Sequence, residues 1–401
     1  MKRQQKAIWI FAGGPMQVAA AREGVERGFK LLVTDRNPAC ICSRYADEVV
    51  ELDTFDIKGN VKAATRLAKK YRIQAVLAPA ADCHETVAHV GKTLGLPAIS
   101  PGISRVCRYK NLTREVLTTG KIPQPKFRTV RSVAEAKEFL REVGNRGVVK
   151  ATDNSGSRGF GAIRDAGDLT EEVFERAVDA GTTGQVVVEE MLEPLEDEIS
   201  EQSVETLWYN GKMYWLNWVD RLFRKDFLLF DSLKTGIYEH VSWGVELGHI
   251  NPALHREEIK EKVRDLIHRA GLAIGMKKEK GGHILKADIM LTAKGPYILE
   301  LTPRLSGGWD SSASTPTRGA DFVGGAISMA LGERLTLESW HRYFQYRNPE
   351  RFASVLARIG EGALDNIGRK FAIGSDFGRE KAIGNALTNL VEGKYVIPMV
   401  Q

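Results

Sequence analysis

The stretch GPYILELTPRLSGGWDSS, residues 295–312, determines how the rest of the chain is interpreted. Its apolar beginning predicts a strand, and the polar residues Glu300, Thr302 and Arg304 follow at alternate positions. Because successive side chains of a strand point to opposite faces, these three groups are expected on one face. The stretch therefore predicts a buried strand that ends in a carboxylate, a hydroxyl and a guanidinium, followed directly by two glycines.

A second carboxylate is expected beside this strand. Asp288 lies twelve residues before Glu300, within the apolar run HILKADIML, and the turn sequence TAKGP separates the two. On antiparallel neighbours the two carboxylates can approach each other, and hard cations such as Mg²⁺ prefer oxygen ligands. The alternative is a solvated strand end with two unrelated acids, which the apolar flanking residues argue against.

A glycine-rich loop lies earlier in the chain, in VVKATDNSGSRGFGAI at residues 148–163. Its small residues let backbone N–H groups approach phosphate oxygens, and Lys150 ends the preceding strand, where it could neutralise them. The lysine comes before the glycines and no GK[ST] follows, so this is not a Walker A loop. A mobile lid over a nucleotide and an ordinary surface hairpin are the two interpretations.

The composition indicates a globular protein with two or three cores. The 401 residues are 43% hydrophobic and 27% charged. We expect a cytoplasmic protein without a membrane partner, because the chain has no run of about 18 apolar residues. Its 57 basic residues are scattered among 51 acidic ones, which argues against nucleic acid and suits a small anionic ligand. The four cysteines lack metal-ligand spacing and are expected to be reduced thiols.

Strands and helices alternate over the first hundred residues, which predicts a doubly wound parallel sheet. The expected strands are AIWIFA, KLLVTD, EVVEL and IQAVLAPA. The turn GGPMQ lacks the full G-x-G-x-x-G pattern of a dinucleotide site, although Asp35 stands about twenty residues beyond it. A nicotinamide site, a structural turn and a substrate-facing loop therefore all stay open.

An α+β segment and an antiparallel segment follow. The proline-rich KIPQP ends a helix, and Asn210-Gly211 between two aromatic-rich runs predicts a hairpin. We assign Trp208, Trp215 and Trp218 to packing rather than to a ligand. A helix is expected from Glu257 to Ile274, and the residues after about Leu335 are expected to form a small C-terminal element.

Taken in this order, the segments resemble the ATP-grasp superfamily over nearly the whole chain. DRNPACICSRYADEVVELDTFD is similar to the domain that precedes the ATP-grasp fold in carbamoyl phosphate synthetase, biotin carboxylase and carboxyaminoimidazole ribonucleotide synthetase. The resemblance implies an α/β protein with four parts: an N-terminal doubly wound domain, a lid subdomain with the glycine loop, a catalytic subdomain, and a C-terminal element, at residues 1–105, 106–188, 189–335 and 336–401.

The resemblance also implies which residues bind the nucleotide. YKNLTREVLTTGKIPQP is similar to the lysine-containing entry segment, VVKATDNSGSRG to the lysine strand and its loop, and VVVEEMLEP to the adenine-binding strand and linker. Glu201 would accept the ribose hydroxyls, and Glu198 competes for this role because the acidic link is long. The implied nucleotide ligands are Lys110, Lys150, Ser155, Gly156, Ser157, Gly159, Glu189, Glu190, Leu192 and Glu201.

The segment ADIMLTAKGPYILELTPRLSGG resembles the metal-binding pair of strands. This implies Asp288, Glu300 and Thr302 as metal ligands, Arg304 as the catalytic arginine together with Lys150, and Arg304, Gly307 and Gly308 as substrate contacts. The family usually carries asparagine at the position of Thr302. Because a hydroxyl is a weaker metal ligand than an amide carbonyl, threonine at this position would weaken the binding of a second metal ion.

The activity implied by the resemblance is an ADP-forming carbon–nitrogen ligase that uses ATP and Mg²⁺, with Mn²⁺ as the alternative ion. A small-molecule carboxylate would be activated as an acyl phosphate and then attacked by an amine. A homodimer is left open. Three alternatives also stay open: a carboxylase or carbamoyl-phosphate-type enzyme using bicarbonate, a nicotinamide-dependent oxidoreductase, and a nucleotide-binding protein without turnover.

Overall fold

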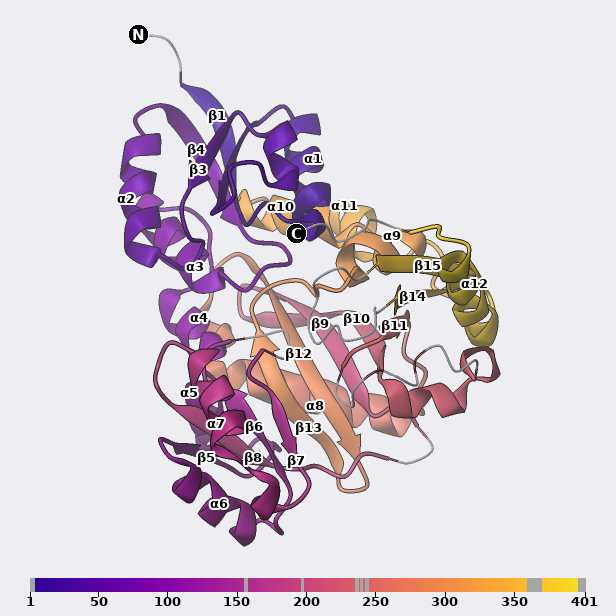
Figure 1. The fold of residues 1–401 in the computed structure, drawn as a ribbon. Coiled ribbons are helices and arrows are strands. Elements are labelled where there is room, and N and C mark those ends of the chain that lie inside the picture. The colour runs from indigo at the N-terminus through magenta and orange to yellow at the C-terminus, as the bar shows by residue number, and fades with distance from the viewer. Residues whose placement is uncertain are drawn as a thin grey trace.

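The computed structural model describes residues 4–154, 158–195, 198–234, 238, 241, 245–358 and 370–395. Within these ranges the chain forms one parallel and two antiparallel sheets with helices packed on them (Figure 1). This mixed α/β architecture is the one predicted from the sequence.

The N-terminal domain is a parallel sheet in the order β3-β2-β1-β4. Strand β1 is buried along Ala7–Phe11, which explains its nearly continuous apolar sequence, because a parallel sheet is covered on both faces. The predicted strand–helix alternation is confirmed. The elements are β1 (Gln5–Phe11), α1 (Val18–Glu26), β2 (Lys30–Asp35), β3 (Glu48–Glu51), α2 (Ile57–Leu67), β4 (Tyr71–Leu77) and α3 (His84–Leu94), with short 3₁₀ turns at Pro15–Gln17 and Ile41–Tyr45.

Two helices lead into the second sheet, whose order is β5-β8-β6-β7. The side chains of Ser132 and Thr170 accept hydrogen bonds from backbone N–H groups three residues later, which fixes the start of each helix on this sheet. The elements are α4 (Pro101–Arg108), α5 (Lys110–Thr119), β5 (Phe127–Val130), α6 (Val133–Glu142), β6 (Gly147–Ala151), β7 (Gly161–Ile163), α7 (Glu171–Asp179) and β8 (Val186–Glu190).

The third sheet is antiparallel, in the order β13-β12-β9-β10-β11-β14-β15. The predicted hairpin joins β9 to β10, and both turn residues are left-handed, Asn210 at φ 49° and Gly211 at φ 81°. The strands are β9 (Glu201–Tyr209), β10 (Lys212–Leu222), β11 (Gly248–Asn251), β12 (Gly282–Thr292), β13 (Gly295–Thr302), β14 (Phe352–Arg358) and β15 (Lys370–Asp376).

The C-terminal strands extend this sheet. β14 pairs with β11 and β15 pairs with β14, so the segment after residue 335 continues the sheet that contains β12 and β13. This pairing satisfies backbone groups of β11 that would otherwise lie at an edge. Between β13 and β14 the chain passes through α9 (Thr315–Thr317), α10 (Phe322–Ala330) and α11 (Leu337–Ser339), with π-helical turns at Asp310–Ser314 and Trp340–Phe344, and it continues after β15 as α12 (Arg379–Val391).

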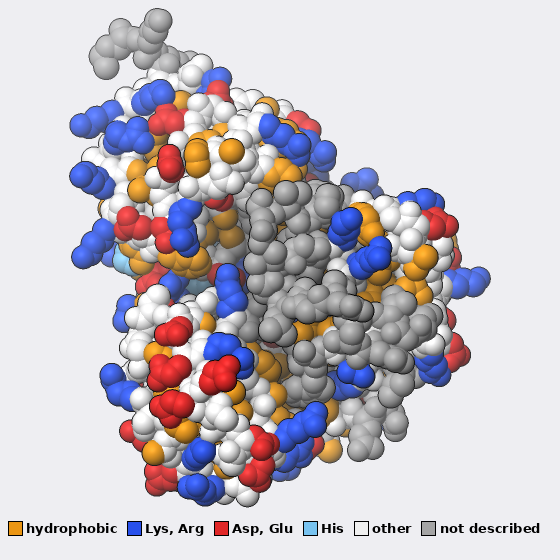
Figure 2. All heavy atoms as spheres, in the orientation of Figure 1, with side chains coloured by type: hydrophobic (Ala, Val, Ile, Leu, Met, Phe, Trp, Pro, Cys, Tyr) orange, Lys and Arg blue, Asp and Glu red, His pale blue; other side chains and the backbone are white. Residues whose placement is uncertain are grey.

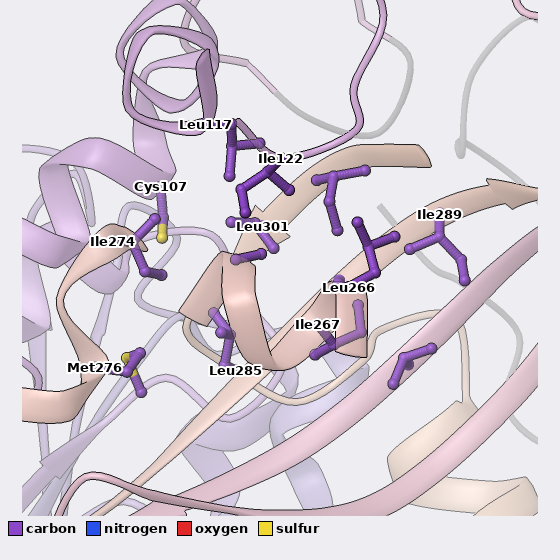
Figure 3. Packing of buried hydrophobic residues seen from close by; sticks show 14 of the residues in the cluster. Cys107, Leu117, Ile122, Leu266, Ile267, Ile274, Met276, Leu285, Ile289 and Leu301 are labelled. Atoms are coloured by element: carbon purple, nitrogen blue, oxygen red, sulfur yellow. The ribbon is translucent and has the colours of Figure 1, made fainter. Parts of the chain in front are cut away.

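Helix α8 (Glu257–Ile274), which has the predicted bounds, packs on the third sheet. Figure 3 shows Leu266 and Ile267 of this helix among side chains of β12 and β13 such as Leu285 and Leu301. Trp208 is fully buried, and a Cβ at Gly271 would lie 2.1 Å from its ring, so helix and sheet touch there. The predicted packing role of the tryptophans is confirmed, since Trp218 belongs to this core and Trp215 packs against it.

Basic and acidic side chains are interspersed over the face of the molecule seen in Figure 2. Among the helices in the described ranges, we found none with the length and apolar character needed to cross a membrane.

Candidate active site

Asp288 and Glu300 lie directly opposite each other on β12 and β13, as predicted. Lys286 Nζ lies 2.5 Å from Asp288 Oδ2, and Arg221 Nε lies 3.3 Å from Asp288 Oδ1. Burial alone would raise the pKa of Asp288, but the two cations outweigh it and lower the pKa to about 2. Oδ1 is buried without a hydrogen-bond partner among the described residues. An ionised carboxylate with a free lone pair therefore faces Glu300.

Lys110 connects these carboxylates to the strand before the glycine loop. Its Nζ lies 3.0 Å from Glu300 Oε1 and donates to the carbonyl of Asn154 at 2.5 Å. Its backbone N–H donates to the carbonyl of Thr152 at 2.8 Å. The first residue of α5 thus places a cation between the carboxylate pair and the loop.

Lys150 takes part in a buried ionic network. Glu189 accepts from Lys150 Nζ and from Arg114 Nε, each at 2.7 Å, and Arg114 also donates to the carbonyls of Ile298 and Leu299 in β13. Burial alone would raise the pKa of Glu189, but Arg114 and Lys150 lower it to about 2. The network joins the second sheet to the strand that carries Glu300. The Glu189 side chain is committed to it, and β8 pairs with both β5 and β6, so an adenine contact would fall to the link that follows the strand.

Glu190, Leu192 and Glu198, which were expected near the adenine and ribose, have different surroundings in the structure. Glu190 accepts from the backbone N–H of Lys126 at 2.9 Å, and Leu192 lies half-buried in the link that follows β8. Glu198 Oε2 lies 3.2 Å from His255 Nδ1.

Glu201 differs from Glu198 in its surroundings. Burial raises the pKa of Glu201 to about 7, against the opposing fields of Lys225, Lys150 and Arg221. The cations that act on Glu201 include Arg221, which borders the carboxylate pair, and Lys150 of the expected nucleotide site. This surrounding favours Glu201 over Glu198 as the ribose ligand, which stays a prediction.

Three residues expected to cradle phosphate, Ser155, Gly156 and Ser157, lie outside the described residues. Gly159 is described, with φ at 71°, and a Cβ there would lie 2.6 Å from Ala180 Cβ. Asn154 Nδ2 donates to the carbonyl of Ala180 at 2.6 Å. Ala180, just after α7, therefore leaves no room for a side chain at position 159. It contacts the residues on both sides of the loop, Asn154 before it and Gly159 after it.

Thr302 is buried and lies opposite Lys286, so its hydroxyl is on the face of Asp288 and Glu300. The guanidinium of Arg304, expected to contact the substrate, is paired within the protein. Its Nε and Nη2 lie 2.7 and 2.5 Å from Asp82 Oδ1, and Nη1 donates to the carbonyl of Leu305. The connection between β4 and α3 brings Asp82 against the end of β13.

The turn GGPMQ borders the predicted substrate glycines. Gly308 N–H donates to Met16 Sδ at 3.3 Å, and a Cβ at Gly307 would lie 3.5 Å from the same sulfur. Asp35 Oδ2 accepts from the backbone N–H of Gly13 at 2.7 Å, so Asp35 stabilises the turn. This placement favours the interpretation of GGPMQ as a substrate-facing loop.

Sequence reasoning missed three charged residues of the site: Arg114, Arg221 and Lys286. The alternation of LKAD in β12 puts Lys286 on the face of Asp288 and could have identified it. Arg114 and Arg221 gave no comparable signal, because their partners are contributed by distant strands.

The comparison with protein families agrees with this architecture. Residues 108–307 match the model described as phosphoribosylglycinamide synthetase, ATP-grasp (A) domain. This range contains the second sheet and the paired carboxylates, and it ends at Gly307 after β13. The chain belongs to the ATP-grasp superfamily.

Among curated proteins, the chain is 24% identical to the protein y4rH of Sinorhizobium fredii over 322 residues, which cover 80% of this chain and 60% of y4rH. It is 29% identical to the carbamoyl phosphate synthase large chain of Thermus thermophilus over 224 residues, which cover 54% of this chain and 18% of that protein. The chain thus spans less than two thirds of either relative.

Among solved structures, the L-amino acid ligase from Bacillus licheniformis is similar in fold, with a TM-score of 0.66, 19% identity, and coverage of 90% of this chain and 82% of the ligase.

Proposed function

We propose that this protein is an ATP-dependent ligase that activates a small carboxylate as an acyl phosphate and joins it to an amine, releasing ADP and phosphate. The observation that carries the proposal is the pairing of Asp288 with Glu300 between the cations Lys110 and Arg221. Carboxylates that face each other on paired strands, bordered by cations, suit the binding of a metal and a polyphosphate.

The donor set fits a hard divalent cation. Asp288 Oδ1 is a buried oxygen of an ionised carboxylate; Arg221 Nε lies 3.3 Å away without a hydrogen bond to it, so a metal ion could still take its lone pair. Mg²⁺ or Mn²⁺ would be held by Asp288 and Glu300, with the Thr302 hydroxyl as a neutral third oxygen. When bound, such an ion neutralises phosphate charge as the phosphoryl group is transferred.

The chain's own residues would bind and orient the nucleotide. Lys150 and Lys110 contact the phosphates, the link from β8 to Leu192 borders the adenine, and Glu201 accepts from the ribose. Glu189 and Arg114 orient Lys150 through the buried ion pairs described above. A cytoplasmic location and a homodimer stay predictions.

In the first step, a carboxylate oxygen of the substrate attacks the γ-phosphorus of ATP, and the bond from that phosphorus to the β–γ bridging oxygen breaks to release ADP. In the second step, the amine nitrogen attacks the acyl carbon, the carbon–oxygen bond to phosphate breaks, and the nitrogen loses a proton. Both steps require in-line positioning and charge neutralisation rather than a protein nucleophile. Arg304 and Arg221 supply positive charge on the two sides of the carboxylate pair.

The test is ADP release from ATP and Mg²⁺ with a panel of amino acids, other small carboxylates, bicarbonate and amines. Formation of ADP that depends on both a carboxylate and an amine supports the ligase. Turnover with bicarbonate alone would identify a carboxylase, and binding of ATP without turnover would identify a sensor. Thermal stabilisation by NAD(P) but not by ATP would refute the proposal.

A further inference from the structure

Arg221 and Glu246 form an ion pair beside the carboxylates of the active site. Arg221, the next-to-last residue of β10, contacts Glu246 through Nη1, and its Nη2 lies 3.4 Å from Ser306 Oγ. Its Nε lies 3.3 Å from Asp288 Oδ1. The guanidinium therefore joins the proposed metal site to the glycine segment after β13.

The pair is partly exposed beside the glycine segment. The Arg221 and Glu246 side chains are 15% and 32% exposed. A Cβ at Gly308 would lie 3.9 Å from Glu246 Oε1, at van der Waals distance, so Glu246 lies directly against this glycine. Met16 of the N-terminal turn lies on the other side of the glycines. A small molecule bound at the exposed edge of the pair would touch both charges.

The arginine of this pair has capacity for a ligand. Arg304 donates to Asp82 and to the carbonyl of Leu305, whereas the terminal nitrogens of Arg221 contact only the partly exposed Glu246 side chain and, at 3.4 Å, the Ser306 hydroxyl, which a ligand carboxylate could replace. A guanidinium binds a carboxylate through two parallel N–H groups, and a carboxylate such as Glu246 is a suitable partner for an ammonium group. Arg221 and Glu246 together can therefore bind a carboxylate and an ammonium group side by side.

We propose that Arg221 and Glu246 form the subsite of the carboxylate substrate, and that this substrate is an α-amino acid. The assignment rests on the ligase function proposed above. Arg221 holds the substrate carboxylate next to Asp288, where the phosphoryl group is transferred, and Glu246 holds the ammonium group. Without substrate, Arg221 and Glu246 neutralise each other. When the amino acid binds, Arg221 pairs with its carboxylate and Glu246 with its ammonium group, so neither side chain is left as an unpaired charge.

The arrangement also separates the roles of two amines. An ammonium group held by Glu246 stays protonated and is not a nucleophile, so the nitrogen that attacks the acyl phosphate belongs to the second substrate. Bicarbonate has no ammonium group and gains nothing from Glu246.

The experiment measures ADP release with each of the twenty amino acids, and then compares the best of them with its analogue that lacks the α-amino group. In Glu246→Gln we expect the KM for the amino acid to rise about tenfold or more, with unchanged affinity for ATP and little effect on the analogue. Arg221→Lys keeps the charge but loses the planar fork, so it should raise the KM for both molecules. Glu261→Gln on the exposed face of α8 is the matched control and should resemble the wild type.

The possible results distinguish a wrong assignment of the Arg221–Glu246 subsite from a wrong ligase function. ADP release that depends on bicarbonate or a simple carboxylate, with no response to any amino acid, overturns the subsite and leaves an ATP-grasp enzyme. An equal KM in wild type and Glu246→Gln also overturns it. No substrate-dependent ADP release at all refutes the proposed function itself. If Glu246→Gln does not fold, Glu246→Asp keeps the charge at a shorter reach and should show the same selective rise in KM.

Discussion

Arg304, just beyond the end of β13, donates two hydrogen bonds to one oxygen of Asp82, which lies between β4 and α3 of the N-terminal domain. The Arg304 side chain is only 10% exposed, so its charge depends on this partner. A backbone hydrogen bond joins the same two segments, since Leu305 N–H donates to the carbonyl of Pro79 at 3.0 Å. The N-terminal domain therefore holds a candidate catalytic side chain in place.

We predict that Asp82→Asn lowers the thermal midpoint by about 2–5 °C, because it leaves a mostly buried guanidinium without a countercharge. Replacing Arg304 by methionine in the same protein should recover much of the loss, because both charges are then absent. The measurement is thermal unfolding of the two single variants and the double variant. A midpoint for Asp82→Asn equal to that of the wild type would show that the pair contributes nothing.

The second prediction concerns the chemistry of Arg304. Arg304→Lys keeps a positive charge but loses the planar fork, so it should reduce substrate-dependent ADP release by about tenfold or more. ATP affinity should be retained, because Lys110 and Lys150 lie elsewhere in the site. The two quantities are measured on the same preparations by steady-state kinetics and calorimetric titration. Equal turnover in wild type and Arg304→Lys would leave Arg304 with its structural role alone.

The third prediction separates the two oxygen ligands on β13. Glu300→Gln removes a charge from the carboxylate pair and should nearly abolish ADP formation, whereas Thr302→Asn supplies the amide usual in the family and should preserve or increase it. The readout is initial rate as a function of Mg²⁺ concentration. Loss of activity in a folded Thr302→Asn protein would contradict the role given to that position.

Local patterns predicted most of this fold. The alternation in YILELTPR and KADIML placed polar groups on one face of neighbouring strands, and Asn210-Gly211 specified the hairpin, because these signals depend only on adjacent residues and on pairing across a short turn. The pairing of Asp288 with Glu300 followed for the same reason.

Long-range partners could not be predicted in this way. Asp82 and Arg304 are separated by 222 positions, and their contact depends on how two domains pack. The joining of β14 to β11 also required the tertiary structure, because a short apolar run does not indicate which sheet edge it will complete. Arg221 looked like any basic residue of a strand until β12 placed Asp288 beside it.

The last prediction concerns the pH dependence of Glu201. Burial raises its pKa to about 7 in the folded protein, so the carboxyl group is mostly protonated at pH 6 and mostly ionised at pH 8. A carboxylate accepts hydrogen bonds from both ribose hydroxyls better than the acid does. Its contribution to ATP affinity should therefore increase as the pH rises from 6 to 8.

Because the phosphates of ATP also titrate, the informative quantity is the ratio of ATP affinities in wild type and Glu201→Gln. We expect this ratio to increase severalfold between pH 6 and pH 8, measured by calorimetric titration with Mg²⁺ present. A second readout requires no nucleotide. Since the folded pKa is raised above that of the unfolded chain, ionisation disfavours the fold, and wild-type stability should fall relative to Glu201→Gln as the pH rises from about 4.5 to about 7. A constant affinity ratio together with that change in stability would mean that Glu201 is a buried acid without a ribose contact, and Glu198 would then be the next residue to test.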